Sequence, residues 1–240
     1  MIQRIFTSLA VALCLTGCSA LNYTSIDYSN VDPRRGQAPQ SWALLQRQQA
    51  NNVDTRSPML LRIFKQTHEL ELWRQDRSGT YVLINTFEIC HFSGALGPKK
   101  RTGDMQAPEG FYTVTPAQMN YASREFLSFN TGFPNQFDRA HGRTGSALMV
   151  HGGCRSAGCY AIKDAPMQDL FAAMRDAFAG GQREIQLHIF PFRMDVMNTA
   201  INTGTANQAF WDQLRPGYVQ FERTHRELRV SVVNGRYLVD

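Results

Sequence analysis

The sequence from Ala147 to Tyr160 reads ALMVHGGCRSAGCY. Its opening apolar residues predict a short buried strand that delivers His151 at its end. A glycine-rich loop follows and leads to the thiol of Cys159. A thiol needs a neighbouring base to be a good nucleophile at neutral pH, and an imidazole is such a base. This stretch therefore predicts thiol-based acyl transfer.

Outward from this stretch, apolar and polar residues alternate as they do in half-buried strands. The alternation begins at Met59, and further strands are expected at 81–89, 111–114 and 184–190. A long helix is expected to begin at Asp164, because apolar residues follow it at helical spacing: Met167, Leu170, Phe171, Met174 and Phe178. The predicted fold class is mostly β, an α+β architecture with one prominent helix.

Shifts in composition divide the chain into four parts. Residues 1–17 are predicted to form a signal peptide, and residues 18–57 a polar tether with one short helix at 40–50. Residues 58–193 carry the strands and the prominent helix and form the expected catalytic domain. Residues 194–240 are predicted to be a small appendage, with a helix around 206–214 and a hairpin that turns at Asn234-Gly235.

The N-terminus has the features of a signal peptide that is cut before a lipid-modified cysteine. Arg4 precedes an apolar run from Ile5 to Leu15, which is too short to span a bilayer, and small residues then precede Cys18. A plain secretory signal is the alternative. Ser19 follows the cysteine, and similarity to bacterial lipoproteins then implies sorting to the outer membrane. We therefore expect a periplasmic protein, lipidated at Cys18 and anchored to the inner leaflet of the outer membrane.

The charge of the chain is mildly basic. The full sequence has 25 Lys and Arg against 20 Asp and Glu, a net charge of +5, and removal of Arg4 with residues 1–17 leaves +4. Nucleic-acid proteins usually carry a denser stripe of cations, and export makes such a partner less plausible still. Anionic polymers or lipid headgroups of the cell envelope are better candidates.

Four cysteines remain after the expected cleavage: Cys18, Cys90, Cys154 and Cys159. If Cys18 is acylated and Cys159 stays a free thiol, Cys90 and Cys154 are the pair left for a disulfide. Buried free thiols are equally compatible with the sequence. A Cys154–Cys159 bond is the competing pairing, and it would switch the enzyme off until it was reduced.

A zinc site is the alternative role for the histidines and cysteines. His141, His151, Cys154 and Cys159 are suitable ligand types, but the cysteine spacing lacks the usual two-to-four-residue separation and no second pair supports it. We therefore expect neither a metal nor a cofactor.

Several separate motifs resemble the L,D-transpeptidase catalytic domain, also called the YkuD domain. These are residues 107–112 (APEGFY), His151-Gly152 and the segment 156–159 (SAGC). Residues 137–145, 151–160 and 188–193 look like the YafK (DpaA) subgroup, and the resemblance runs from about Leu60 to Arg193. The chain departs from the larger family in a shorter loop after His151, and in two positions at which the family has His and Arg: Ala157 and Ala161.

The resemblance implies a YkuD-like β-sandwich or barrel with Cys159 as nucleophile and His151 as its base. The N–H groups of Gly158 and Cys159 are expected to stabilise the oxyanion, and Ser156 to orient the loop. His141 is the rival base, because its spacing from the cysteine segment imitates that of the larger family. His151 is favoured, because a strand positions a side chain more rigidly than a loop does.

Substrate binding is expected to involve cations near the nucleophile. Arg139, His141 and Arg143 could form a cradle for substrate carboxylates, and Gly152 is placed with them in the binding site. A solvated loop is the plain alternative for this cluster. The run 99–101 (KKR) is expected to be hydrated, as charge runs in loops usually are.

The resemblance implies an enzyme that forms a thioester on the diaminopimelate-containing stem peptide of peptidoglycan. If water resolves the thioester, the enzyme releases an outer-membrane lipoprotein attached to the stem, which the subgroup resemblance favours. If a second stem amine resolves it, the enzyme is a transpeptidase that forms cross-links or attaches proteins. An inactive, lipid-tethered wall-binding anchor is the alternative from a different class.

Overall fold

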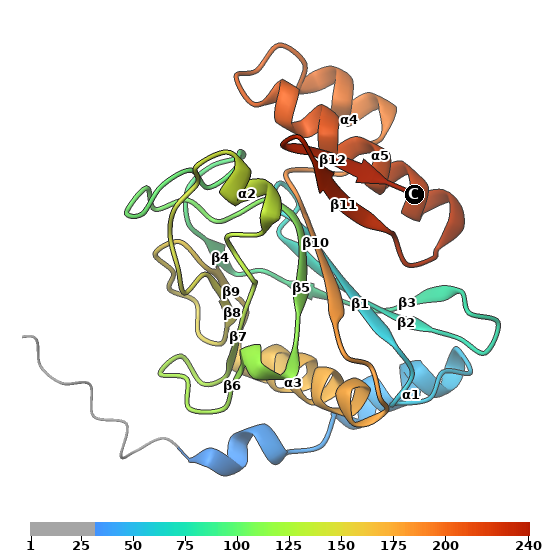
Figure 1. The fold of residues 1–240 in the computed structure, drawn as a ribbon. Helices are drawn as coiled ribbons and strands as arrows, with labels where there is room; N and C mark the ends of the chain where they lie inside the picture. Colours follow the sequence, from blue (N-terminus) through green and yellow to red (C-terminus); the bar gives the residue numbers. More distant parts are fainter. Residues whose placement is uncertain (1–31) are drawn as a thin grey trace, which may run out of the picture.

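The computed structural model describes residues 32–240, which form a layered α+β fold (Figure 1). The signal peptide of residues 1–17 and the predicted lipidation site Cys18 lie outside the described residues. Strands outnumber helices among the described elements, so the predicted fold class is confirmed. None of the described helices is long and apolar enough to cross a bilayer.

A five-stranded sheet, here the central sheet, forms the middle layer. Its strand order is β3 (Tyr81–Glu88), β2 (Glu69–Gln75), β1 (Met59–Phe64), β10 (Ile185–Phe190), β5 (Gly110–Val114). β1 and β10 pair in parallel, while the other neighbours are antiparallel. All residues of β1 are buried, as expected for a strand that is covered on both faces.

A second sheet, here the site sheet, carries the stretch quoted above. Its strand order is β4 (His91–Phe92), β9 (Tyr160–Ala161), β8 (Met149–His151), β7 (Ser128–Asn130), β6 (Met119–Asn120). β8 and β9 are parallel neighbours, although only residues 152–159 connect them. The short helix η2 (Pro116–Gln118) directly precedes β6. The short helix α2 (Gln136–Ala140) packs against the C-terminal part of the chain, where Phe137 contacts Phe210 and Tyr237.

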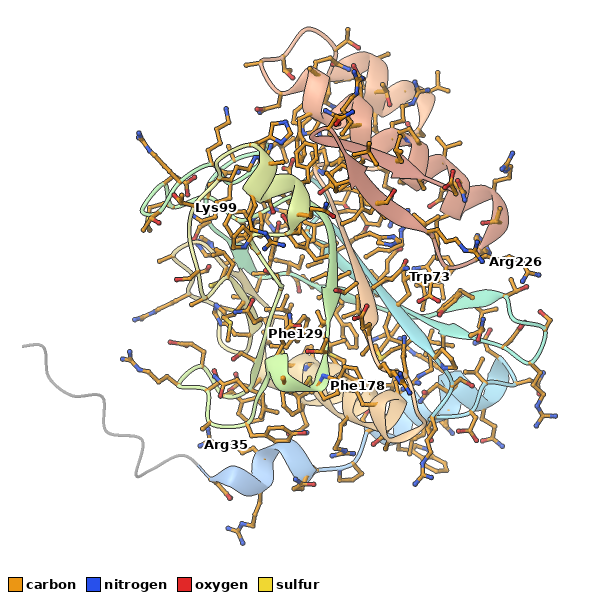
Figure 2. All side chains as sticks on the ribbon, in the orientation of Figure 1. Arg35, Trp73, Lys99, Phe129, Phe178 and Arg226 are labelled. Carbon is orange, nitrogen blue, oxygen red and sulfur yellow. A yellow bond between two sulfur atoms is a disulfide. The ribbon has the colours of Figure 1, made fainter. Side chains whose placement is uncertain are left out.

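The main core lies between one face of the central sheet, the site sheet and the helix α3 (Asp164–Ala179). Leu61 of β1, Phe129 of β7 and Met174 of α3 are buried together in it. The helical stripe predicted from the sequence is therefore core packing, with Phe178 at its margin (Figure 2). The N-terminal elements η1 (Pro33–Gln37) and α1 (Trp42–Ala50) run along α3, and Ser41 donates to Asp169 of that helix at 2.6 Å.

Residues 194–240 cover the other face of the central sheet and are here named the C-terminal layer. They form α4 (Val196–Ile201), α5 (Gln208–Thr224) and the hairpin β11 (Val230–Val233) to β12 (Arg236–Val239). The hairpin turns at Asn234-Gly235, both at positive φ, as predicted. Leu60 and Trp73 of the central sheet pack against Phe221 of α5 in a second, aromatic-rich core (Figure 2).

The helix of this layer is longer than the sequence predicts. It was expected to end near Leu214, but α5 continues through Pro216 to Thr224. A proline inside a helix removes one hydrogen bond and destabilises it by about 3 kcal/mol. Burial of Tyr218 and Phe221 beyond the proline offsets that loss, because each aromatic side chain contributes roughly 1.5–3 kcal/mol when buried.

Candidate active site

The parallel pairing of β8 with β9 brings the two predicted catalytic residues to one face of the site sheet. Val150 pairs with Tyr160 and His151 with Ala161, so Cys159 lies beside Met149. The Met149 N–H points at Cys159 Sγ at 3.3 Å, in agreement with this register. Side chains alternate between faces along a strand, so Met149, His151 and Cys159 share a face. The pairing of two short strands thus places the imidazole near the thiol.

Cys159 is a free, partly buried thiol, and its surroundings favour the protonated form. Burial raises the pKa of Cys159, and the Met149 N–H and the charge of Lys99 offset this only in part. The thiol lies 3.7 Å from the Ala147 carbonyl, which can accept a hydrogen bond from the protonated thiol. A protonated thiol is a weak nucleophile, so Cys159 needs a base to react near neutral pH.

His151 is 5% exposed, and its hydrogen bond determines which ring nitrogen can act as that base. Nδ1 lies 2.6 Å from the Gly152 carbonyl oxygen, which can only accept a hydrogen bond. Nδ1 therefore carries the proton, and Nε2 keeps a lone pair that can accept the proton of a thiol. This tautomer suits a general base.

The Ser156 hydroxyl forms two hydrogen bonds to the backbone of Cys159. Its Oγ accepts the Cys159 N–H at 2.8 Å and donates to the Cys159 carbonyl at 2.7 Å. The Ser93 hydroxyl donates to Ser156 Oγ at 3.2 Å. The single O–H donor and both lone pairs of the Ser156 hydroxyl are therefore used. Ser93 follows β4 and is a positioning residue that the sequence analysis did not identify.

These bonds change the expected oxyanion site. The Cys159 N–H, assigned to the oxyanion in the sequence analysis, is already donated to Ser156 Oγ. The Gly158 N–H has no hydrogen-bond partner among residues 32–240, and Gly158 adopts a φ of 118° that favours glycine. Gly158 is thus the better placed of the two predicted donors in the resting geometry.

A disulfide between Cys90 and Cys154 ties the middle of the loop to the strand region before β4. Its Cα atoms are 5.7 Å apart, and it joins residues 64 positions apart. Gly153 N–H donates to Asp164 at the start of α3 at 2.8 Å, and Gly152 N–H donates to Leu127 O at 3.0 Å. The loop that carries Cys159 is therefore pinned on both sides, and Cys159 is left unpaired.

The residues proposed as a substrate cradle have partners inside the protein. Arg143 pairs with the buried Asp138 at 2.8 Å, and its guanidinium lies over Phe137 and Phe210. His141 stacks on Phe137 with ring centroids 4.1 Å apart, and Nδ1 lies 2.9 Å from the Phe137 carbonyl. Neither side chain bonds to residues 147–160 of the described chain, so the geometry favours a packing role for both.

The other two members of the predicted binding set also have local roles. Arg139 is exposed and donates to the Pro134 carbonyl. A Cβ on Gly152 would lie 2.8 Å from Asp164, from the Glu125 carbonyl and from Phe126. Gly152 is thus required for close packing of the loop against its neighbours.

Lys99 was expected to be hydrated, and this expectation is wrong. Only 4% of Lys99 is exposed, and its Nζ pairs with Asp104 and donates to the Arg101 carbonyl. Its charge acts on Cys159. A run of charged residues in a loop carries no local signal that one member folds inward, so sequence reasoning missed it.

A buried ion pair holds the loop that carries Lys99. Glu109 accepts the Gly97 N–H at 2.6 Å, the Lys65 ammonium at 3.0 Å and the Trp211 indole N–H at 2.9 Å. Lys65 also donates to the Gly97 and Ala107 carbonyls, both at 3.0 Å. The C-terminal layer is therefore connected through Trp211 and Glu109 to the loop that carries Lys99.

Within the described chain, no group of three or more His, Cys, Asp or Glu side chains could hold a metal ion. His141, at the end of α2, stacks on Phe137 and does not join His151. Cys154 is in a disulfide.

Comparison with known proteins identifies the family. No protein-family model matches the sequence. The chain is 44% identical over 183 residues to "Putative L,D-transpeptidase YafK" of Escherichia coli strain K12, an alignment that covers 76% of this chain and 74% of the relative. The protein of the same name from Escherichia coli O157:H7 matches equally. The chain belongs to the L,D-transpeptidase family. Within it the chain is YafK-like, as the motifs in the sequence indicated.

The solved structures that match are more distant in sequence. The helical cell shape determining protein Pgp2 from Campylobacter jejuni is 14% identical, with a TM-score of 0.46 and coverage of 78% of this chain and 80% of that one. Bd1075 from Bdellovibrio bacteriovorus is 18% identical, with a TM-score of 0.39 and coverage of 70% and 56%.

Proposed function

We propose that this L,D-transpeptidase-family protein is a periplasmic cysteine enzyme of peptidoglycan. Its Cys159 forms a thioester on the diaminopimelate stem peptide, and water then hydrolyses that thioester. The product is a stem with a free carboxylate and a released outer-membrane lipoprotein. The placement of a free thiol and a buried imidazole with an available Nε2 on one face of the site sheet carries this proposal. The 44% identity to a YafK protein supports it.

The first step is attack of Cys159 Sγ on the amide carbonyl at the stem's diaminopimelate. His151 Nε2 accepts the thiol proton as the S–C bond forms, and Gly158 N–H donates to the developing oxyanion. Collapse of the tetrahedral intermediate breaks the C–N bond, and His151 returns the proton to the leaving amine. An acyl-enzyme thioester remains, and no outside oxidant or cofactor takes part.

The second step regenerates the thiol. His151 Nε2 accepts a proton from water, and the resulting hydroxide adds to the thioester carbonyl. The C–S bond then breaks, and Cys159 takes the proton back from His151. Attack by a second stem amine in place of water would instead form a cross-link.

The N-terminal predictions complete the proposal. A signal peptide of residues 1–17 and acylation of Cys18 would anchor the mature protein to the inner leaflet of the outer membrane. The predicted tether of residues 18–57 is shorter than expected, because η1 and α1 lie within it and Ser41 bonds to Asp169 of α3. Residues 19–31 would then link the lipid anchor to the folded domain.

The test is incubation of soluble protein lacking residues 1–18 with sacculi that carry covalently attached lipoprotein. This protein retains all described residues. Released lipoprotein and muropeptides are identified by mass spectrometry. We expect lipoprotein release by the wild type, none by Cys159→Ala, and at least a hundredfold slower release by His151→Gln. His141→Gln is the matched control and should keep its activity, because His141 packs on Phe137.

Each other outcome has a clear meaning. Release by Cys159→Ala at the wild-type rate would overturn the thioester mechanism. New dimeric muropeptides without lipoprotein release would identify a transpeptidase. Binding to sacculi without any product would identify a wall-binding anchor.

A further inference from the structure

A cavity of about 500 Å³ lies between the edge of the central sheet and the C-terminal hairpin. Residues 111–113 of β5 line one side, and residues 230–232 of β11 line the other. No residue of the 147–160 stretch lines it, so the cavity is separate from the Cys159 loop. Its volume is within the range of sites that bind small molecules and short peptides.

On the β5 side, the last strand of the central sheet, side chains already bond to most outward backbone groups. The Phe111 carbonyl accepts the Asn135 side chain at 2.7 Å, and the Phe111 N–H donates to the Tyr237 hydroxyl at 3.5 Å. The Thr113 carbonyl accepts the Gln118 side chain at 3.3 Å. Outward and inward groups alternate along a strand, so the Thr113 N–H points the same way. That N–H has no hydrogen-bond partner among residues 32–240.

The β11 side is the other strand edge that faces the cavity. Arg229 and Asp240 exchange both backbone hydrogen bonds, at 3.0 and 3.1 Å, and therefore form a hydrogen-bonded pair. Alternation along the hairpin then turns the backbone groups of Val230 and Val232 away from β12. Both valines line the cavity, and the Val232 carbonyl accepts the Gln136 side chain at 3.4 Å. The N–H groups of the two valines, like that of Thr113, have no hydrogen-bond partner among residues 32–240. These N–H groups can donate to carbonyl or carboxylate oxygens of an extended peptide.

A buried acceptor also lines the cavity. His188 is 1% exposed, and its Nε2 lies 3.0 Å from Gln186 Oε1. The amide of Gln186 is oriented by its own donation to the Leu228 carbonyl at 2.7 Å, so Nε2 of His188 must be the donor. Nδ1 then keeps its lone pair and has no partner among residues 32–240. This nitrogen is covered by its neighbours, so a ligand in the cavity would contact the surroundings of the ring and not Nδ1 itself.

The charges around the cavity favour an acidic ligand. Arg139 and Arg229 are exposed side chains that line it, and the guanidinium fork suits carboxylates. Glu184 is the single acidic residue of the lining. A peptide with several carboxylates therefore fits better than a neutral one.

We propose that this cavity binds a second peptidoglycan stem peptide in extended form, between β5 and β11, with its carboxylates on Arg139 and Arg229. The proposal deepens the proposed function and rests on it for the identity of the peptide. Such a site would hold the enzyme on the cell wall while Cys159 reacts with a neighbouring stem.

The test is a titration followed by amide NMR. Soluble Cys159→Ala protein lacking residues 1–18 receives a diaminopimelate-terminated stem tripeptide. Saturable shifts are expected at the amides of Thr113, Val230 and Val232. The same tripeptide with its carboxylates converted to amides should bind at least tenfold more weakly.

Two sets of variants extend the test in the same background. Arg139→Gln with Arg229→Gln should weaken the Kd at least tenfold. Val230→Pro removes an outward N–H that the hairpin does not use and should also weaken binding, whereas Val230→Ala is the matched control and should not. A spectrum that retains its dispersion shows that each variant is folded.

The site of the shifts separates this proposal from the proposed function. Shifts confined to residues 147–160 would overturn the second site and leave the Cys159 mechanism standing. Shifts at the cavity of Cys159→Ala, combined with no lipoprotein release by the wild type, would support the site and reject the mechanism. Equal Kd values for the double arginine variant and its parent would overturn the proposal.

Discussion

At the scale of single residues, the site depends on how a few atoms are already bonded. His151 is held in one tautomer by the Gly152 carbonyl, and Cys159 is held at its backbone by Ser156. Lys99 is buried, and its charge partly offsets the effect of burial on the thiol. Each of these contacts predicts how a single substitution would change the reactivity of Cys159.

Alkylation of Cys159 should depend on pH in a way that reports the charge of Lys99. Burial raises the pKa of Cys159, so alkylation of the unsubstituted protein should still accelerate above pH 9, the ordinary value for the thiol. Lys99→Met removes a neighbouring positive charge and should raise the pKa further, which slows alkylation at each lower pH. The rate of alkylation by iodoacetamide is measured against pH for the unsubstituted protein and for Lys99→Met. Lys100→Met, at an exposed position, is the control. The same pH profile for Lys99→Met and the unsubstituted protein would show that the charge of Lys99 does not act on the thiol.

Ser156→Ala should lower activity by misplacing the nucleophile. The substitution removes both bonds to the Cys159 backbone, and we expect a loss of about 1–3 kcal/mol in the free energy of unfolding. Because the hydroxyl does not touch substrate in the proposed mechanism, kcat should fall more than KM rises. Ser93→Ala is the matched comparison, since it removes one bond to Ser156 and should have the smaller effect. Equal kcat for wild type and Ser156→Ala would show that the serine has no positioning role.

At the scale of elements, the loop before β5 is ordered by Asp104. Burial alone would raise the pKa of Asp104, but hydrogen bonds from Lys99 and from the backbone N–H groups of Arg101, Lys100 and Gln106 outweigh it and lower the pKa to about 2. A lowered carboxyl pKa contributes stability above the unfolded value of 3.8, and that stability is lost as pH falls toward 2. The loop should therefore lose its order in acid.

The acid sensitivity can be measured by urea unfolding between pH 6 and pH 2. Asp104 should contribute about 2 kcal/mol to the free energy of unfolding at pH 6, and that contribution should fade below pH 4. Asp104→Asn should be less stable than wild type at pH 6, and the difference should shrink toward zero at pH 2. A difference that stays constant over this range would contradict the account.

At the scale of the whole molecule, the C-terminal layer is part of the folded unit. It covers the aromatic face of the central sheet, including Leu60 and Phe64. Arg62, which is fully buried, pairs with Glu222 of α5 at 2.7 Å. Trp211 of the same helix donates to the buried Glu109. The sequence analysis treated 194–240 as an appendage, whereas these contacts indicate mutual dependence.

Deletion of 194–240 should therefore prevent stable folding of the rest of the chain. The deletion would expose the face that Leu60, Phe64 and Trp73 form, and each large apolar side chain contributes roughly 1.5–3 kcal/mol when buried. We expect insoluble protein, or a loss of the cooperative thermal transition in circular dichroism. The milder Trp211→Phe variant should fold with a lower Tm. A soluble, cooperatively folding 32–193 fragment would contradict this prediction.

Local patterns in the sequence determined much of the fold. The apolar run before His151 becomes β8, the stripe after Asp164 becomes the buried face of α3, and Asn234-Gly235 makes the hairpin turn. These features are set by side-chain periodicity and turn chemistry, which act between residues close in sequence. The motif around Cys159 likewise pointed to the family.

Tertiary structure alone decided the features that depend on distant residues. The bond from Trp211 to Glu109 spans 102 positions, and the disulfide from Cys90 to Cys154 spans 64. The Lys99 side chain points inward because it forms an ion pair with Asp104. The Arg143 side chain points inward because it forms an ion pair with the buried Asp138. A charged side chain leaves water only where a partner compensates its desolvation, and the chain must fold before that partner is present.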